Sequence, residues 1–354
     1  MTLHLEIEGR RIGPEEPPYI IAEVSANHNG DIERARAILR GAKEAGADAV
    51  KLQTYTADTM TIDCDRKEFT IRGGLWDGAS LYELYTDAHT PWDWHPVLFE
   101  EARTLGITIF SSPFDASAVE FLEDLGAPAY KIASFEIIDI PLIERCARTG
   151  KPLVISRGMA TLAEIEDAVT AARGAGCEQI LLLHCTSGYP STVDDCNLST
   201  IRHMREMFDV PVGFSDHTIG SAMPIAACAL GASAIEKHVT LKSDDGGPDG
   251  AFSLAATELR DMVDGCRDAH RAIGRPRYTP TLHEAANRAL RRSIYAVADI
   301  PAGAELTTEN VRCIRPGHGL PPKEFPRILG AHAARDISRG EPMDWNLINF
   351  TNGG

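Results

Sequence analysis

Eight short apolar runs, separated by longer segments with helical periodicity, constrain the fold of this chain more than any other feature. The first helical segment begins with Asp31, a residue type that caps helices, and ends before Gly46. Repeated βα units of this kind form parallel sheets, and eight of them close into a barrel. The runs are YIIAEV (19–24), AVKLQ (49–53), TIFSSP (108–113), AYKIAS (129–134), PLVIS (152–156), ILLLHC (180–185), PVGFSDH (211–217) and AIEKHVT (234–240). The sequence therefore predicts an α/β chain with a (β/α)8 TIM barrel.

The rest of the 354 residues predicts a second, smaller domain. A barrel of this type takes about 250 residues. One more helical pattern spans 255–273, and a Pro- and Arg-rich connection, GRPRYTPT, follows it. After residue 288 the chain has short strand patterns and turn pairs such as PAG and RGEP. We expect a barrel over 1–275, a linker over 276–287 and a small, mostly β domain over 288–354.

The connection after the second strand, about residues 54–95, is long and rich in aromatic side chains. Long βα loops of a barrel usually shape its active site. This segment is therefore expected to form a lid or an interface.

Composition excludes several classes of protein. A formal net charge of −16 opposes attraction to phosphate backbones, so nucleic acid is not expected as a partner. No apolar run approaches the roughly 20 residues of a membrane span, and the first residues carry no export pattern. The eight cysteines include no Cys-x-x-Cys pair. These features predict a cytoplasmic protein with reduced thiols and no membrane partner.

Polar residues at the ends of the predicted strands mark the expected active site, because reacting groups of barrels lie at the C-terminal ends of strands. Lysine is a compact positive charge and serine an adaptable donor, so a group of them can hold a phosphate and a carboxylate. The alternative is that each lysine is a solvated charge on the rim. The group consists of Lys51, Lys131, Ser134, Ser156 and Ser215.

Two histidines, His217 and His238, end consecutive predicted strands, where their imidazoles can meet on one divalent ion. The alternative is a pair of hydrogen-bonded rim histidines. Glu23, at the end of the first strand, is either a proton-handling group or part of the scaffold. Asp249 lies in a glycine-rich stretch and is compatible with turn formation alone.

Seven strings occur in an order that resembles the N-acetylneuraminate (sialic acid) synthase family. The C-terminal 65 or so residues, with IRPGHGLPP, are similar to the antifreeze-like (SAF, β-clip) domain that ends these synthases. The strings are IAEVSANHNG, GADAVKLQTY, FSSPFD, YKIASFEI, HCTSGYPS, GFSDHTIG and GASAIEKHVTL. The family condenses phosphoenolpyruvate with an N-acetylated amino sugar, releases phosphate by C–O cleavage and requires Mn²⁺ or Mg²⁺.

The resemblance implies a role for each matching position. His217 and His238 match metal ligands, and Glu23 matches a glutamate of proton handling and sugar binding. Arg315 matches an arginine that one subunit inserts into its partner's active site, which implies a domain-swapped homodimer. Positions that match the phosphoenolpyruvate site are Lys51, Ser112, Lys131, Ser134, Ser156, Ser187 and Ser215, and positions on the sugar side are Glu136, Tyr189 and Asp249.

Within the family, LYELYTDAHTPWDWH, LQTYTADTMT and the GGPD-x-AFSL stretch resemble the pseudaminic acid synthase branch. The resemblance implies 2,4-diacetamido-2,4,6-trideoxy-L-altrose as the acceptor. Alternative acceptors are N-acetylmannosamine and the legionaminic acid precursor. One position departs from the family pattern: Arg157, in ISRGMA, stands where threonine is expected. It either alters phosphate binding or points outward.

Two other classes of function remain open. Lys51, Lys131 or Lys237 can form a Schiff base as in class I aldolases. The C-terminal domain can also belong to an ice- or saccharide-binding protein, although the many ionisable residues at strand ends argue against a mere scaffold.

Overall fold

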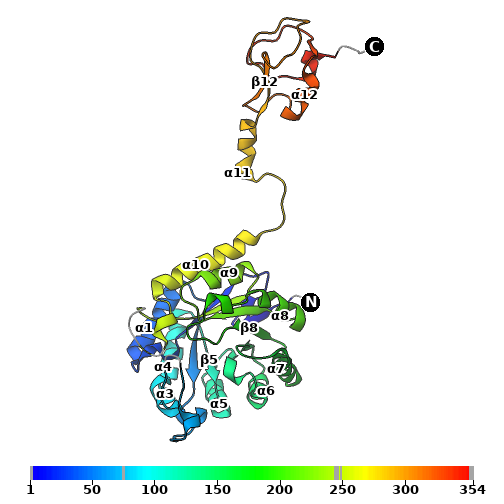
Figure 1. Ribbon diagram of the computed structural model, residues 1–354. Helices are drawn as coiled ribbons and strands as arrows, with labels where there is room; N and C mark the ends of the chain where they lie inside the picture. Colours follow the sequence, from blue (N-terminus) through cyan, green and yellow to red (C-terminus); the bar gives the residue numbers. More distant parts are fainter. Residues whose placement is uncertain (1–2, 74–75, 243–246, 248, 351–354) are drawn as a thin grey trace. The chain divides into compact units, whose positions relative to one another are not determined.

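Eight parallel strands close into a barrel in the computed structural model, which describes residues 3–73, 76–242, 247 and 249–350 (Figure 1). The strands follow one another around the barrel in chain order, and the last pairs with the first. They are β3 (Tyr19–Glu23), β4 (Ala49–Thr54), β5 (Thr108–Pro113), β6 (Tyr130–Ile132), β7 (Leu153–Ser156), β8 (Ile180–Cys185), β9 (Val212–Asp216) and β10 (Ala234–His238). All eight strands predicted from the sequence are confirmed.

Helices lie around the outside of the barrel (Figure 1). The first, α1 (Ile32–Ala45), begins at Asp31, whose side chain accepts from the Glu33 backbone N–H, and ends at Gly46 with a φ of 92°. The predicted helix at 255–273 is α10 (Ala256–Ile273). Further helices that connect barrel strands are α4 (Trp94–Leu105), α5 (Ala116–Asp124), α6 (Ile140–Ala147), α7 (Leu162–Gly174), α8 (Ser199–Phe208) and α9 (Ala222–Ala229).

Each barrel strand alternates between two faces, and the two faces differ in chemistry. Outward residues such as Ile20, Val50 and Leu182 belong to the apolar cluster shared with the helices. Inward residues are apolar at the start of a strand and polar at its end: Ala129 is followed by Lys131, and Ala234 by Glu236. The interior of the barrel is therefore filled by apolar side chains at the N-terminal ends of the strands and lined by polar side chains at their C-terminal ends.

An N-terminal hairpin, which the sequence did not predict, closes the lower end of the barrel. It consists of β1 (Leu5–Ile7) and β2 (Arg10–Ile12), paired antiparallel. Its buried Leu5, Ile7 and Ile12 join the inward apolar residues of the strands in one cluster. The segment was missed because three-residue strands carry little periodicity.

The segment after β4 contains helices rather than one long loop. They are α2 (Ala57–Met60), a 3-10 helix (Lys67–Phe69) and α3 (Leu81–Ala88). A capping box at Ser80 and Glu83 starts α3.

The chain divides into a barrel unit, 1–274, and a C-terminal unit, 275–354. The C-terminal unit has its own small apolar core, which includes Ile294, Leu306 and Ile337. Its strands pair antiparallel as β11 (Ser293–Ala296) with β12 (Val311–Ile314), and as β13 (His332–Ala333) with β14 (Ile348–Asn349). Its α-helices are α11 (Leu282–Ala285) and α12 (Phe325–Ile328). In the described part of the chain, no helix combines the length and apolarity that a membrane crossing needs.

Candidate active site

A cavity of about 330 Å³ opens among the C-terminal ends of the barrel strands. Most of the predicted site residues line it: Lys51, Lys131, Ser134, Glu136, Ser156, Ser187, Tyr189, Ser215, His217, His238 and Asp249. Glu23 and Ser112 lie one step behind this surface, within contact distance of Lys51. The strand pattern therefore brings together residues that are up to about two hundred positions apart in the sequence.

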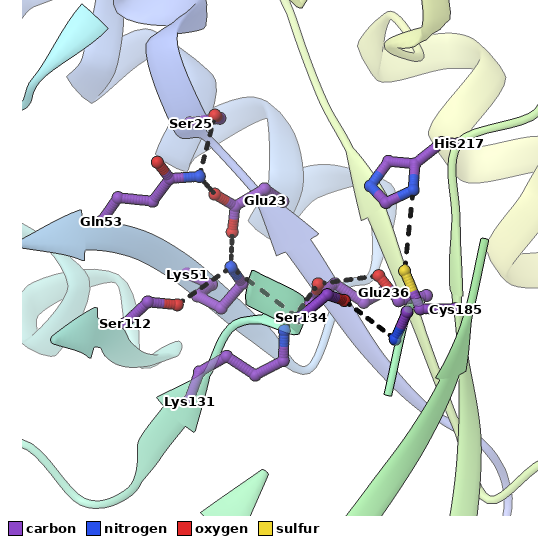
Figure 2. Close-up of polar contacts among 12 residues, drawn as sticks. Glu23, Ser25, Lys51, Gln53, Ser112, Lys131, Ser134, Cys185, His217 and Glu236 are labelled. Atoms are coloured by element: carbon purple, nitrogen blue, oxygen red, sulfur yellow. Dashed lines mark hydrogen bonds and ion pairs between the residues drawn. The ribbon is translucent and has the colours of Figure 1, made fainter. Parts of the chain in front are cut away.

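Lys51 forms the first charged contact at the bottom of the cavity (Figure 2). Its Nζ lies 2.5 Å from Glu23 Oε2 and 3.4 Å from Ser112 Oγ. Gln53 Nε2 donates to Glu23 Oε1 and to Ser25 Oγ, both at 3.0 Å, which fixes the orientation of the carboxylate. Burial raises the pKa of Glu23 despite the opposing effect of Lys51. A carboxyl with a raised pKa at this position can take up and release a proton.

Lys131 and Glu236 form the second charged contact (Figure 2). Lys131 Nζ lies 3.2 Å from Glu236 Oε1, and Ser215 Oγ donates to the same oxygen at 3.0 Å. Burial opposes ionisation of Glu236, but Lys131 and Lys51 lower its pKa to about 2. Burial lowers the pKa of Lys131. An ionised Glu236 thus stabilises two buried ammonium groups before any substrate binds.

Hydroxyl groups converge beside the two lysines. Ser134 Oγ accepts from the Gly158 backbone N–H at 3.1 Å, and Ser156 Oγ is buried without a hydrogen-bond partner in the described structure. A Cβ on Gly158 would lie 2.0 Å from Ser187 Oγ, so only glycine leaves that hydroxyl in place. Hydroxyl groups, one of them unpaired, next to two ammonium groups suit the oxygens of a phosphate or carboxylate.

The two predicted metal ligands lie together, with ring centroids 5.2 Å apart. The Thr186 carbonyl is 2.9 Å from His217 Nδ1 and can only accept, so Nδ1 carries the proton and Nε2 presents its lone pair. His238 Nδ1 is buried without a hydrogen-bond partner in the described residues and lies 3.7 Å from Asp249 Oδ2. These atoms suit two ligands of an ion whose other ligands are water or substrate. The described residues contain no group of three or more His, Cys, Asp or Glu that could hold a metal.

Aromatic side chains form the outer wall of the cavity. Tyr189 lies between His217, with ring centroids 4.4 Å apart, and Trp76, at 6.1 Å. Tyr55 contacts Tyr85, also at this wall. Glu136 is the wall's acidic group, and burial raises its pKa to about 7. An apolar wall with a few polar groups suits a sugar that carries methyl groups.

The predictions for Lys237 and Arg315 have different outcomes. Lys237 faces away from the cavity: its Nζ lies 2.6 Å from Asp216 Oδ2 and also donates to the Thr218 carbonyl. It is therefore wrong as a Schiff-base candidate. Arg315 is exposed at the end of β12 in the C-terminal unit, and its action across subunits stays a prediction.

The sequence did not assign roles to Glu236, Gln53 and Cys185. Glu236 is the buried counter-ion of both lysines, and Gln53 orients Glu23. Cys185 Sγ lies 3.8 Å from His217 Nδ1, a contact that lowers the thiol's pKa to about 7 against the effect of burial. Glu236 and Gln53 occupy inward strand-end positions, the same signal that identified the lysines.

The fold and the site define a class: a TIM-barrel enzyme whose mouth combines buried lysines and serine hydroxyls, which suit a small anion, with an aromatic wall. The sequence matches the profile of the NeuB family over residues 38–278 and that of the SAF domain over 291–349. The chain belongs to the NeuB family. The resemblance found in the sequence is thereby confirmed.

Several curated relatives span nearly the whole chain. A pseudaminic acid synthase of Helicobacter pylori is 46% identical over 93% of this chain and 97% of its own. One of Campylobacter jejuni is 43% identical over 92% and 95%. A solved N-acetylneuraminic acid synthetase of Leptospira borgpetersenii, in complex with citrate, matches with a TM-score of 0.72 at 31% identity, over 81% of this chain and 95% of its own.

Proposed function

We propose that this protein is a pseudaminic acid synthase, which condenses phosphoenolpyruvate with 2,4-diacetamido-2,4,6-trideoxy-L-altrose and water and releases phosphate. The similarity to pseudaminic acid synthases at 43–46% identity supports this acceptor, since an N,N'-diacetyllegionaminic acid synthase of Legionella pneumophila is 36% identical. The observation that carries the proposal is the convergence of Lys51, Lys131 and several serine hydroxyls, among them the unpaired Ser156, at the barrel mouth.

The site supports separate positions for the two substrates, with phosphoenolpyruvate at the bottom of the cavity and the sugar above it. Lys51 and Lys131 neutralise the phosphate and carboxylate of phosphoenolpyruvate, with Ser112, Ser134, Ser156, Ser187 and Ser215 as hydroxyl donors. The sugar lies above, against Tyr189, Glu136 and Asp249. This places C3 of phosphoenolpyruvate next to the aldehyde carbon, so that the new C–C bond forms between two held reactants.

The reaction then needs one water and one bond cleavage. Water adds to C2, and the bond between C2 and the phosphate oxygen breaks, leaving a 2-keto acid and inorganic phosphate. Glu23, whose pKa is raised by burial, accepts one proton of the water and passes it to the former aldehyde oxygen, which becomes a hydroxyl, while the other proton of the water leaves with the phosphate. His217 and His238 hold Mn²⁺ or Mg²⁺, which supplies a Lewis acid for the sugar aldehyde.

The proposed domains are a catalytic barrel over 1–275, a linker over 276–287 and a SAF domain over 288–354. In a domain-swapped homodimer, Arg315 of the SAF domain completes the sugar side of the other subunit's site. An arginine that is exposed directly after β12 is compatible with this role.

Phosphate release with Mn²⁺ and three acceptors tests the function. The acceptors are the diacetamido-trideoxy-altrose, N-acetylmannosamine and the legionaminic acid precursor. Selective turnover of the altrose sugar is expected. Preference for another acceptor would overturn the proposed substrate while keeping the reaction, and no turnover with any of the three would overturn the catalytic proposal. A borohydride-trapped pyruvate adduct without metal dependence would instead indicate a class I aldolase.

A further inference from the structure

A second cavity, of about 350 Å³, adjoins the substrate cavity. It lies beside the ends of β7 and β8, and Cys185 and Ser187 line both cavities. Its remaining wall contains Arg157, His184, Thr186, Ser191, Asp195 and Asn197 among other residues. Apart from the Thr186 carbonyl, which contacts His217, these residues have no part in the proposed chemistry.

Arg157, directly after the last residue of β7, supplies the positive charge of this cavity. A guanidinium nitrogen lies 2.6 Å from His184 Nδ1, and His184 Nε2 lies 2.5 Å from the Cys196 carbonyl. A carbonyl only accepts, so Nε2 carries the proton and Nδ1 accepts from Arg157. Burial and Arg157 lower the pKa of His184 to about 4, in agreement with a neutral ring. His184 thus orients the guanidinium without neutralising it.

No carboxylate of the described residues lies within ion-pair distance of Arg157, whose side chain contacts His184. The group whose charge opposes the lowering of the pKa of Arg157 by burial is the Cys185 thiol, on the shared wall of the two cavities. Arg157 Nε is buried without a hydrogen-bond partner in the described structure, as is Thr186 Oγ1. Asp195 also lines the cavity, but its carboxylate accepts from Thr192 Oγ1 at 2.7 Å and pairs with no described cation. A half-buried guanidinium without a carboxylate partner favours binding of an anion, and its planar set of N–H donors suits phosphate oxygens.

We propose that the Arg157 cavity is a second phosphate site, which receives the inorganic phosphate that leaves the reaction centre. The inference rests on the proposed function for the source of the phosphate. Ser187 forms the shared wall, and Ser156, a hydroxyl of the proposed phosphoenolpyruvate site, immediately precedes Arg157 in the chain. The departing anion therefore moves from one group of donors to the next without crossing an apolar barrier.

Equilibrium titration of the full-length protein with inorganic phosphate, without and with saturating phosphoenolpyruvate, tests the site directly. We expect phosphate to bind while phosphoenolpyruvate is bound. Arg157→Met should weaken this binding at least tenfold and change the dissociation constant of phosphoenolpyruvate less than threefold. Arg157→Lys should retain part of the affinity, and Asp195→Asn should strengthen it, because a negative charge leaves the cavity. Arg173→Met is the matched control, since Arg173 donates to the Phe208 carbonyl outside the cavity.

Three results would overturn the inference. One is unchanged phosphate binding in Arg157→Met; another is an equal loss of phosphoenolpyruvate binding, which would place Arg157 in the substrate site. The third is unchanged or weaker binding in Asp195→Asn. If Arg157→Met does not fold, phosphate binding by Arg157→Lys and Asp195→Asn tests the inference instead. These measurements need no turnover, so an inactive protein that still loses phosphate binding with Arg157→Met would contradict the proposed function alone.

Discussion

Lys131 Nζ and Glu236 Oε1 lie 3.2 Å apart inside the barrel, a buried ion pair at the place where the proposed substrate is itself an anion. Burial lowers the pKa of Lys131, and the charge of Glu236 opposes that effect. Glu236 also lies 3.9 Å from Lys51, so one carboxylate supports both lysines. The carboxylate therefore maintains the positive charge that receives phosphoenolpyruvate.

Glu236→Gln should weaken use of phosphoenolpyruvate by roughly 2 kcal/mol or more, the usual loss for one partner of a buried charge pair. Without the carboxylate the pKa of Lys131 falls further. A protonated lysine binds the anion below its pKa and loses it above, so the basic limb of the kcat/KM profile should move to lower pH. The pH profile checks this, with Glu206→Gln on the exposed Arg202 pair as the control. An unmoved limb would contradict the role of Glu236.

Glu23→Gln should lower kcat by about 10²-fold or more, as expected for loss of a general acid–base group. The amide keeps the size of the side chain and its contact with Gln53. The KM for phosphoenolpyruvate should change less, because Lys51 and Lys131 remain. Steady-state kinetics separate the two parameters, and a normal kcat would remove Glu23 from proton transfer.

His217→Gln or His238→Gln should abolish most Mn²⁺ binding, since each variant removes one of the two imidazoles, whose ring centroids lie 5.2 Å apart. Electron paramagnetic resonance of added Mn²⁺ measures the bound fraction without turnover. His203→Gln, an exposed histidine on α8, serves as the control. Retained binding in either cavity variant would overturn the metal assignment.

Arg315→Ala should reduce the use of the sugar by roughly 1.5–3 kcal/mol, the contribution of a hydrogen bond to a charged group. A mixed dimer of Arg315→Ala and His217→Ala chains should regain activity, because one of its sites combines an intact barrel with an intact arginine. Kinetics on co-expressed, separately tagged chains provide the measurement. If activity does not recover, the result would argue against a domain-swapped dimer. An equal loss of phosphoenolpyruvate affinity would argue against the placement of Arg315 on the sugar side of the site.

Asp216→Asn should destabilise the barrel by about 3–5 kcal/mol, because it leaves the fully buried Lys237 without its counter-ion. Asp216→Leu combined with Lys237→Met should recover much of that loss, since both charges are then absent. Urea unfolding gives the free energies. A single variant as stable as the original protein would show that the pair contributes nothing to folding.

The barrel was predictable because its strands are β-branched runs of the length that periodicity reveals, and β4, β5 and β8 match the predicted ranges within one residue. The lysines, serines and histidines followed from their places at strand ends. Glu236 was not assigned, because a sequence gives no distance between two strand-end groups, and its role depends on 3.2 Å to Lys131. The Schiff-base prediction for Lys237 was wrong for a related reason. The sequence does not show which alternate side chains of β10 face the cavity; Glu236 and His238 face it, and Lys237 faces away.

The β1–β2 hairpin has a kinetic consequence. Leu5, Ile7 and Ile12 fill the lower end of the barrel, and the substrate cavity opens among the C-terminal ends of the strands. The lysines lie at its floor and the aromatic residues at its rim, so a sugar that arrived first would block the way to the floor. The proposed reaction should therefore follow a compulsory order, with phosphoenolpyruvate first, and a dead-end sugar analogue should inhibit uncompetitively against phosphoenolpyruvate.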